Sequence, residues 1–142
     1  MSNLNAFLKP VYKEKQIKII LGDRFVNENG EPEPVIMKSL TQEKIQEIAQ
    51  RSTKEKKVNG KVVQDIDAIE NMNRCLVESI VFPDLKSTEL CRANGTEDPA
   101  LLPAKLFLVD EYNLLTQAFA KLNGIKMGQD GEFEIPGEVT KN

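Results

Sequence analysis

Residues 108–124 carry the strongest helical pattern in the chain and read LVDEYNLLTQAFAKLNG. Large apolar or aromatic side chains recur there at spacings of four, three, four and three residues: Leu108, Tyr112, Leu115, Phe119 and Leu122. This spacing places them on one face of an α-helix. Gly124 can adopt the left-handed conformation that often ends a helix. We therefore predict a helix with Pro103 in its first turn that ends near Lys121, with this stripe of side chains in the core.

Shorter helices are predicted upstream from their capping residues. Thr41 is a good N-cap for a helix over residues 41–51. Residues 65–82 are expected to form a core helix, because six positions fall on one arc at about 100° per residue: Ile66, Ile69, Asn73, Leu76, Val77 and Ile80. A short helix is predicted over residues 87–93, and Asp98 followed by a proline marks a further helical start.

The N-terminal part of the chain has the two-residue period of a β-strand instead. Apolar side chains alternate along residues 16–25, and a second apolar run occupies residues 34–39. Asn29 and Gly30 lie between these segments and favour a tight turn. We predict an antiparallel hairpin with a polar, loose tip.

Two further segments are predicted to be flexible. Residues 52–61 are rich in charges, and residues 126–142 contain three of the eight glycines together with scattered charges. The predicted fold class is therefore α+β. It comprises one mostly helical domain over residues 1–125 with an N-terminal antiparallel β-hairpin, followed by a flexible C-terminal tail over residues 126–142.

The composition narrows the classes of function. The chain has 142 residues, with 19 Lys and Arg against 22 Asp and Glu, a net charge of −3 and no histidine. This balance offers no large positive field for nucleic acid or an anionic membrane, so neither is an expected partner. The missing histidine removes every histidine-based triad and metal site. The N-terminus lacks the basic and apolar runs of a signal peptide, which favours a cytoplasmic location.

The remaining chemical candidates are interpreted as structural. The pairs Asp110–Glu111 and Asp65–Asp67 are taken as solvated helix charges, and Cys75 and Cys91 as inert, partly buried thiols. The basic run over residues 54–57 could contact an acidic partner or RNA, but such a run is usually a solvated loop. We expect no catalytic residue, no cofactor and no metal ligand, so the protein is predicted not to be an enzyme.

Short sequence pieces at the joints between these elements resemble the XkdN-like tail assembly chaperones of phages and defective prophages. The resemblance runs from about residue 4 to residue 125 and depends on the order and spacing of seven pieces. They are NLNAFL (3–8), DRF (23–25), KSLT (38–41), VFPDL (81–85), PALL (99–102), DEYNLL (110–115) and LNGI (122–125).

The resemblance implies a cytoplasmic protein of the bacterial host that binds the phage tape-measure protein and helps tail-tube subunits polymerise around it. Such a protein is not expected in the mature virion. The candidate partner surfaces are the open edge of the hairpin and the helical stripe, where Tyr112, Leu115 and Phe119 are the predicted partner-binding residues. The alternative is a structural tail or baseplate subunit. Self-association into a homo-oligomer stays open, because the stripe also suits a coiled-coil seam.

Overall fold

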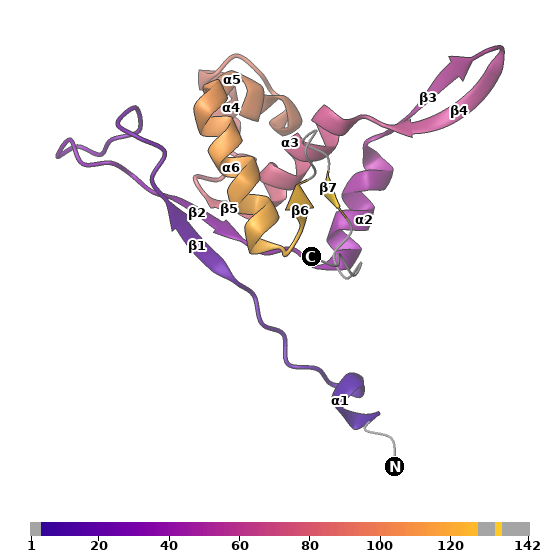
Figure 1. Cartoon of the computed structure of the whole chain (residues 1–142). Coiled ribbons are helices and arrows are strands. Elements are labelled where there is room, and N and C mark those ends of the chain that lie inside the picture. Colours follow the sequence, from indigo (N-terminus) through magenta and orange to yellow (C-terminus); the bar gives the residue numbers. More distant parts are fainter. Residues whose placement is uncertain (1–3, 128–132, 135–142) are drawn as a thin grey trace.

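The computed structural model describes residues 4–127 and 133–134 and has the predicted α+β fold. Its helices are α1 (Asn5–Leu8), α2 (Gln42–Arg51), α3 (Ala68–Ser79), α4 (Thr88–Ala93), α5 (Leu102–Leu106) and α6 (Val109–Leu122), with a 3₁₀ turn over Pro99–Leu101. Its strands are β1 (Gln16–Ile19), β2 (Val35–Lys38), β3 (Thr53–Val58), β4 (Lys61–Ile66), β5 (Ile80–Phe82), β6 (Lys126–Met127) and β7 (Phe133–Glu134). In Figure 1, α6 crosses in front of a small sheet, and the N-terminal arm with α1, the β1–β2 connection and the β3–β4 hairpin project from the body.

The central sheet has the strand order β1-β2-β5 and contains the predicted N-terminal hairpin. β1 and β2 are antiparallel, with Ile17 opposite Met37 and Ile19 opposite Val35. β1 is shorter than predicted and ends at Ile19; beyond it, the two sides of the connection meet again at an antiparallel bridge between Val26 and Pro32. The tip is not loose: the Asn27 side chain accepts hydrogen bonds from the amides of two loop residues at 2.9 and 3.0 Å.

The strand β5 was not predicted, since its residues were assigned to the end of a long core helix. The helix α3 instead ends at Ser79, whose hydroxyl donates a 2.6 Å hydrogen bond to the carbonyl oxygen of Lys38 in β2. This bond ties the end of α3 to the sheet, and the next residues pair with β2 in the antiparallel direction. The start of the core helix was also predicted wrongly: Asp67 caps α3, Ile66 lies in β4, and Ile69 is 73% exposed.

The core lies between the sheet and helices α2, α3, α4, α5 and α6. Its members come from both ends of the described chain, which makes one continuous cluster: Ile19, Val35, Met37, Ile48, Met72, Cys75, Leu76, Val77, Ile80, Leu85, Cys91, Leu102, Phe107, Leu115, Phe119 and Leu122. The predicted caps hold as well. Thr41 and Ser87 accept hydrogen bonds from the amides three residues ahead, and Gly124 has a φ of 68° after α6.

The single helix predicted after Pro103 is two helices. α5 ends at Leu106, and Phe107 adopts an extended conformation that directs its buried ring toward Phe25, with the two ring centroids 6.0 Å apart. α6 then starts after Leu108, which is 53% exposed rather than part of the buried stripe. The gain from burying an aromatic ring explains why the helix is interrupted there.

The charged segment predicted to be a flexible connection forms a regular antiparallel hairpin. Six residue pairs join β3 to β4, and Asn59 and Gly60 make the two-residue turn with φ of 54° and 81°. An Asn-Gly pair between two strand-compatible segments is a strong hairpin signal, so the sequence did contain this information. The many charges of residues 52–61 favoured a flexible segment, but the turn determines the structure.

The C-terminal segment contains one short antiparallel pair, β6 with β7. Residues 128–132 and 135–142, which make up most of the predicted flexible tail, lie outside the described residues. The assignment of residues 126–142 as a tail therefore stays a prediction.

Deletion of residues 126–142 is expected to leave the melting temperature almost unchanged. Glycines and charges leave little apolar area there to offset an ordering cost of roughly 1 to 2 kcal/mol per residue. Thermal unfolding of the truncated and full chains followed by circular dichroism would measure the difference. A fall of more than about 8 °C would show that these residues pack on the core.

Candidate protein-binding site

The surface between the outer edge of β1 and one side of α6 forms an apolar groove of about 690 Å³. Within the described residues, β1 pairs only with β2, so its other edge has unpaired backbone groups. We call this surface the β1–α6 groove; its lining residues are Lys15, Ile17, Lys18, Ile19, Ile20, Leu114, Gln117, Ala118, Lys121 and Leu122. The open hairpin edge proposed from the sequence lies in this groove. Of the predicted helical stripe, Leu122 alone is among the lining residues, and the other α6 residues of the groove lie outside that stripe.

The β1–α6 groove combines an apolar floor with a cationic rim. Ile20 is 53% exposed and Leu114 is 39% exposed, and both are large side chains on the surface. Lys15, Lys18 and Lys121 are exposed and take part in none of the ion pairs found among the described residues. In a chain of net charge −3, these three free ammonium groups favour an acidic partner.

The N-terminal end of α6 is fixed by an ion pair between residues that are far apart in the sequence. Arg24 donates from Nε and Nη2 to the two carboxylate oxygens of Glu111 at 2.9 and 2.8 Å, and Nη2 also donates to the carbonyl oxygen of Leu106 at 2.8 Å. Glu111 is only 4% exposed and also accepts a 2.8 Å bond from the Leu108 amide at the start of α6. The bidentate geometry holds the helix start against the chain that follows β1.

The same contacts explain the electrostatics of this pair. The hydrogen bond from Arg24 lowers the pKa of Glu111 below its usual value, and burial opposes that effect without cancelling it. The carboxylate also raises the pKa of Arg24. The prediction that Glu111 is a solvated helix charge was therefore wrong. Asp110 is exposed as expected, and the chemistry of the pair is structural.

The other end of α6 is fixed by an asparagine. The side-chain oxygen of Asn123 accepts a 2.8 Å hydrogen bond from the amide of Leu40, in the connection between β2 and α2. Its side-chain nitrogen donates to the carbonyl oxygen of Phe119 at 2.9 Å. The Arg24–Glu111 pair at one end and Asn123 at the other thus tie α6 to the segments that follow β1 and β2.

The three predicted partner-binding residues are placed behind this surface. Leu115 is 0% exposed and Phe119 is 1% exposed, so in the free chain both side chains belong to the core. Tyr112 is half-buried, and its hydroxyl donates a 2.7 Å hydrogen bond to the side-chain oxygen of the buried Asn73 in α3. These residues support α6 from the inside, while Leu114, Gln117 and Ala118 of the same helix line the groove.

The other chemical candidates also have structural roles. Asp65 forms a 3.0 Å ion pair with Lys56, and this contact lowers the pKa of the carboxyl group. Cys75 and Cys91 are free and buried more deeply than expected, and burial raises the pKa of the Cys75 thiol to about 12, which keeps it protonated at neutral pH. Among the described residues, no group of three possible ligands could hold a metal ion, and no helix is long and apolar enough to span a membrane.

These contacts also link the pieces of sequence that resembled a known family. Arg24 of DRF meets Glu111 of DEYNLL, and Leu40 of KSLT meets Asn123 of LNGI. Neither contact was predicted from the sequence, because the two residues in each are far apart in the chain, by 87 and 83 positions. The sequence signal for these contacts was that the pieces occur together in one chain. The protein is thus a small α+β domain in which these pieces hold α6 beside the edge strand β1.

The chain belongs to the family described as phage XkdN-like tail assembly chaperone proteins, whose sequence profile matches residues 4–135. It is similar to the phage-like element PBSX protein XkdN of Bacillus subtilis (strain 168), with 34% identity over 131 residues that cover 90% of this chain and 85% of that protein. The protein YqbN of the same strain is 33% identical over an equal length with the same coverage. A crystal structure of YqbN is similar to the fold, with a TM-score of 0.71 at 26% identity, and covers 85% of this chain and 96% of that chain.

Proposed function

We propose that this protein is a chaperone that binds the tape-measure protein in the host cytoplasm and assists assembly of the tail tube around it, without catalysis. Membership of the tail assembly chaperone family supports a role in assembly. The observation that carries the finer proposal is the β1–α6 groove, because it joins exposed apolar side chains, an open strand edge and three free lysines.

The chemistry of the groove defines the segment that would fit it. An apolar floor takes the apolar face of an amphipathic helix or strand, and the free edge of β1 offers backbone groups to an extended segment. The lysine rim selects acidic residues on the flanks of that segment. We therefore assign the groove to an acidic, amphipathic segment of the tape-measure protein, whose apolar side would otherwise be exposed before the tube closes around it.

Substitution of Leu114 by glutamate is expected to weaken capture of the tape-measure protein about tenfold or more, which corresponds to about 1.4 kcal/mol. The reason is that a carboxylate placed in the apolar floor must lose water when the partner binds. The measurement is co-purification of the tape-measure protein with each co-expressed variant, followed by titration of the purified pair. Because Leu114 is partly exposed, the variant should keep the melting temperature of the parent chain within a few degrees.

Val109→Glu is the matched control, since Val109 lies on the same helix, is 78% exposed and does not line the groove. A second pair tests the rim: Lys121→Glu should weaken binding, whereas Lys105→Glu, an equal charge change outside the groove, should not. Equal binding by Leu114→Glu and Val109→Glu would contradict the assignment of the groove. No capture by the unmodified chain would contradict the proposed function itself.

The structural tail or baseplate subunit remains the alternative to be separated by experiment. A chaperone is released, so it should be present in lysates during assembly and absent from purified particles. Quantitative mass spectrometry of purified particles distinguishes the two, and a stoichiometric amount of this chain in them would favour the structural subunit.

A further inference from the structure

The hairpin formed by β3 and β4, residues 53–66, projects away from the body of the molecule (Figure 1). We call it the basic hairpin. All its residues except Thr53 are exposed, including four large aliphatic side chains: Val58, Val62, Val63 and Ile66. A two-stranded hairpin alone in water is marginally stable, and exposed apolar side chains on such an extension are typical of a contact surface.

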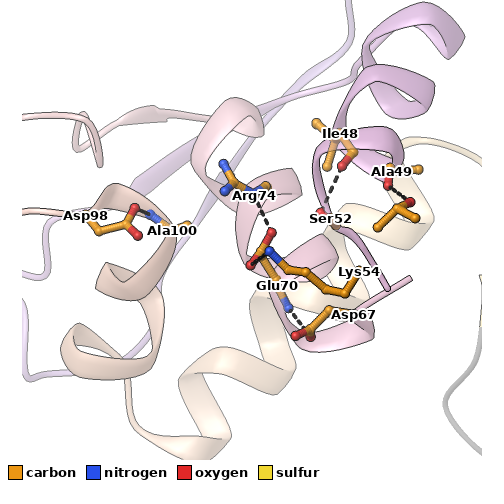
Figure 2. Close-up of polar contacts among 10 residues, drawn as sticks. Ile48, Ala49, Ser52, Lys54, Asp67, Glu70, Arg74, Asp98 and Ala100 are labelled. Atoms are coloured by element: carbon orange, nitrogen blue, oxygen red, sulfur yellow. Dashed lines mark hydrogen bonds and ion pairs between the residues drawn. The ribbon is translucent and has the colours of Figure 1, made fainter. Parts of the chain in front are cut away.

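The base of the basic hairpin is nevertheless held firmly (Figure 2). Lys54 and Arg74 both pair with the carboxylate of Glu70, at 3.2 and 3.1 Å. The buried Ser52 donates its hydroxyl to the carbonyl oxygen of Ile48 at 2.8 Å, and its own carbonyl accepts the Asp67 amide at the same distance. The hairpin is therefore a positioned extension of α2 and α3, about 20 Å long for six residues in each strand.

The far half of the basic hairpin, residues 56–63, is positively charged and has no acidic residue. It holds three lysines, Lys56, Lys57 and Lys61, and three of the exposed valines. Lys56 forms an ion pair with Asp65, which lies nearer the base. Lys57 and Lys61 take part in none of the ion pairs found in residues 4–127. The far half thus offers valine side chains and two free cations to a partner.

A surface of matching chemistry lies on the opposite side of the molecule. Residues 26–34, the last part of the β1–β2 connection, contain Glu28, Glu31 and Glu33 and no basic residue, and we call them the acidic loop. None of these three carboxylates takes part in the ion pairs of the described chain. The loop therefore has a charge of −3 against the +3 of residues 56–63, and Figure 1 shows the two projecting in opposite directions.

An apolar hollow of about 350 Å³ adjoins the acidic loop. Val26 and Glu33 of the loop line it together with Phe82 of β5 and Leu90 of α4. Phe82 is 45% exposed, so an aromatic surface is available there. The hollow can accept aliphatic side chains such as the valines of the basic hairpin. Glu33 lines it, as does Arg24, whose guanidinium is paired with Glu111, and Glu28 and Glu31 belong to the adjoining loop.

We propose that the far half of the basic hairpin of one copy docks in the hollow beside the acidic loop of a second copy. The charge complementarity of the two surfaces and the match of valines to an apolar hollow carry this assignment. Because the two surfaces point away from each other, one chain cannot satisfy both by itself. Each chain then donates a hairpin to one neighbour and accepts a hairpin from another, which yields a closed ring or an open helical chain of subunits.

The test is the mass of the full chain in solution, measured by analytical ultracentrifugation over a range of protein concentrations. At an ionic strength of about 0.01 M, where the screening length is about 30 Å, the unmodified chain should form species larger than one copy. At about 1 M, where the screening length is about 3 Å, these species should decrease. A chain that stays monomeric at high protein concentration in both salts would overturn the proposal.

Charge reversal on each surface provides the matched variants. Lys57→Glu with Lys61→Glu should weaken self-association about tenfold or more, and so should Glu28→Lys with Glu31→Lys. Neither pair belongs to a side-chain hydrogen bond or ion pair of the described residues, so both variants should fold, and circular dichroism checks this. Mixing the two variants, or combining all four changes in one chain, should restore association. Failure of both restorations would overturn the pairing of these two surfaces.

The remaining interpretation of the basic hairpin, contact with RNA, gives a different result. In that case a labelled RNA oligonucleotide would bind the unmodified chain in a salt-dependent way, and the hairpin reversal would remove this binding. The loop reversal would leave self-association unchanged. That combination would overturn the proposal and assign the hairpin to nucleic acid.

Discussion

Replacement of Phe119 by alanine is expected to lower the free energy of unfolding by about 3 to 5 kcal/mol. Phe119 is 1% exposed and is the largest fully buried side chain among the described residues. Its neighbours in the cluster come from the sheet and from helices that are fixed by other contacts, so the cavity cannot close easily. The loss is a large share of the roughly 5 to 15 kcal/mol of a typical domain.

Urea or guanidinium denaturation followed by circular dichroism measures this change, and Leu114→Ala is the control from the same helix. Leu114 is 39% exposed, so its truncation should cost about 1 kcal/mol or less. Phe119→Leu should keep most of the stability and all of the partner capture. A cost below about 1 kcal/mol for Phe119→Ala, together with loss of tape-measure binding, would show instead that the ring is a direct contact residue.

Replacement of Glu111 by glutamine is expected to lower the free energy of unfolding at pH 7 by about 1.5 to 3 kcal/mol, the range for hydrogen bonds to charged groups. The carboxylate is buried and accepts bonds from Arg24 and from the Leu108 amide. Arg24 is 42% exposed, so water screens part of the attraction and the lower half of this range is expected.

The pH dependence gives this contact a signature. Because the pKa of Glu111 is lower in the folded chain than in the unfolded chain, the contact stabilises fully above the ordinary pKa of glutamate. Its contribution is lost as the pH falls through the lower folded pKa. The stability difference between the parent chain and Glu111→Gln should therefore shrink in acid. Denaturation at pH 7 and at several lower pH values measures it.

Glu43→Gln is the matched control for this experiment. Glu43 is an exposed glutamate in the first turn of α2 and forms none of the ion pairs among the described residues. Its substitution should change stability by less than about 1 kcal/mol at every pH. A difference that is constant with pH for Glu111→Gln would mean that the ion pair contributes no protonation-linked stability.

Local signals in the sequence predicted much of the fold. Caps such as Thr41 and Ser87 and the stop at Gly124 act over one helical turn, so the residues concerned are close together in the chain. The alternation in residues 16–25 and 34–39 predicted the N-terminal hairpin for the same reason. The class of the fold, α+β with one long C-terminal helix, follows from these patterns.

The parts that sequence analysis missed depend on contacts between distant residues. The break between α5 and α6 exists because Phe107 packs on Phe25, and no pattern near residue 107 shows that partner. The strand β5 forms because β2 is there to pair with it. Glu111 was predicted to be a solvated charge because its partner, Arg24, lies 87 positions away in the sequence. Of the candidate groove, the open edge of β1 was predicted from the sequence. The side of α6 with Leu114 and Ala118 was not, since its place beside β1 depends on the position of the whole helix.

The free edge of β1 has a consequence for how long a bound segment stays. An open strand edge is a template for aggregation, and lysines along it discourage the edges of two identical chains from pairing. Lys15 and Lys18 are exposed along this edge and act in this way while the groove is empty. The same hydrated ammonium groups must be partly stripped of water when a segment docks, and this cost offsets part of their attraction to an acidic partner. In the proposed function, a segment bound at this edge would therefore exchange readily, so that tube subunits could displace the chaperone without an input of chemical energy.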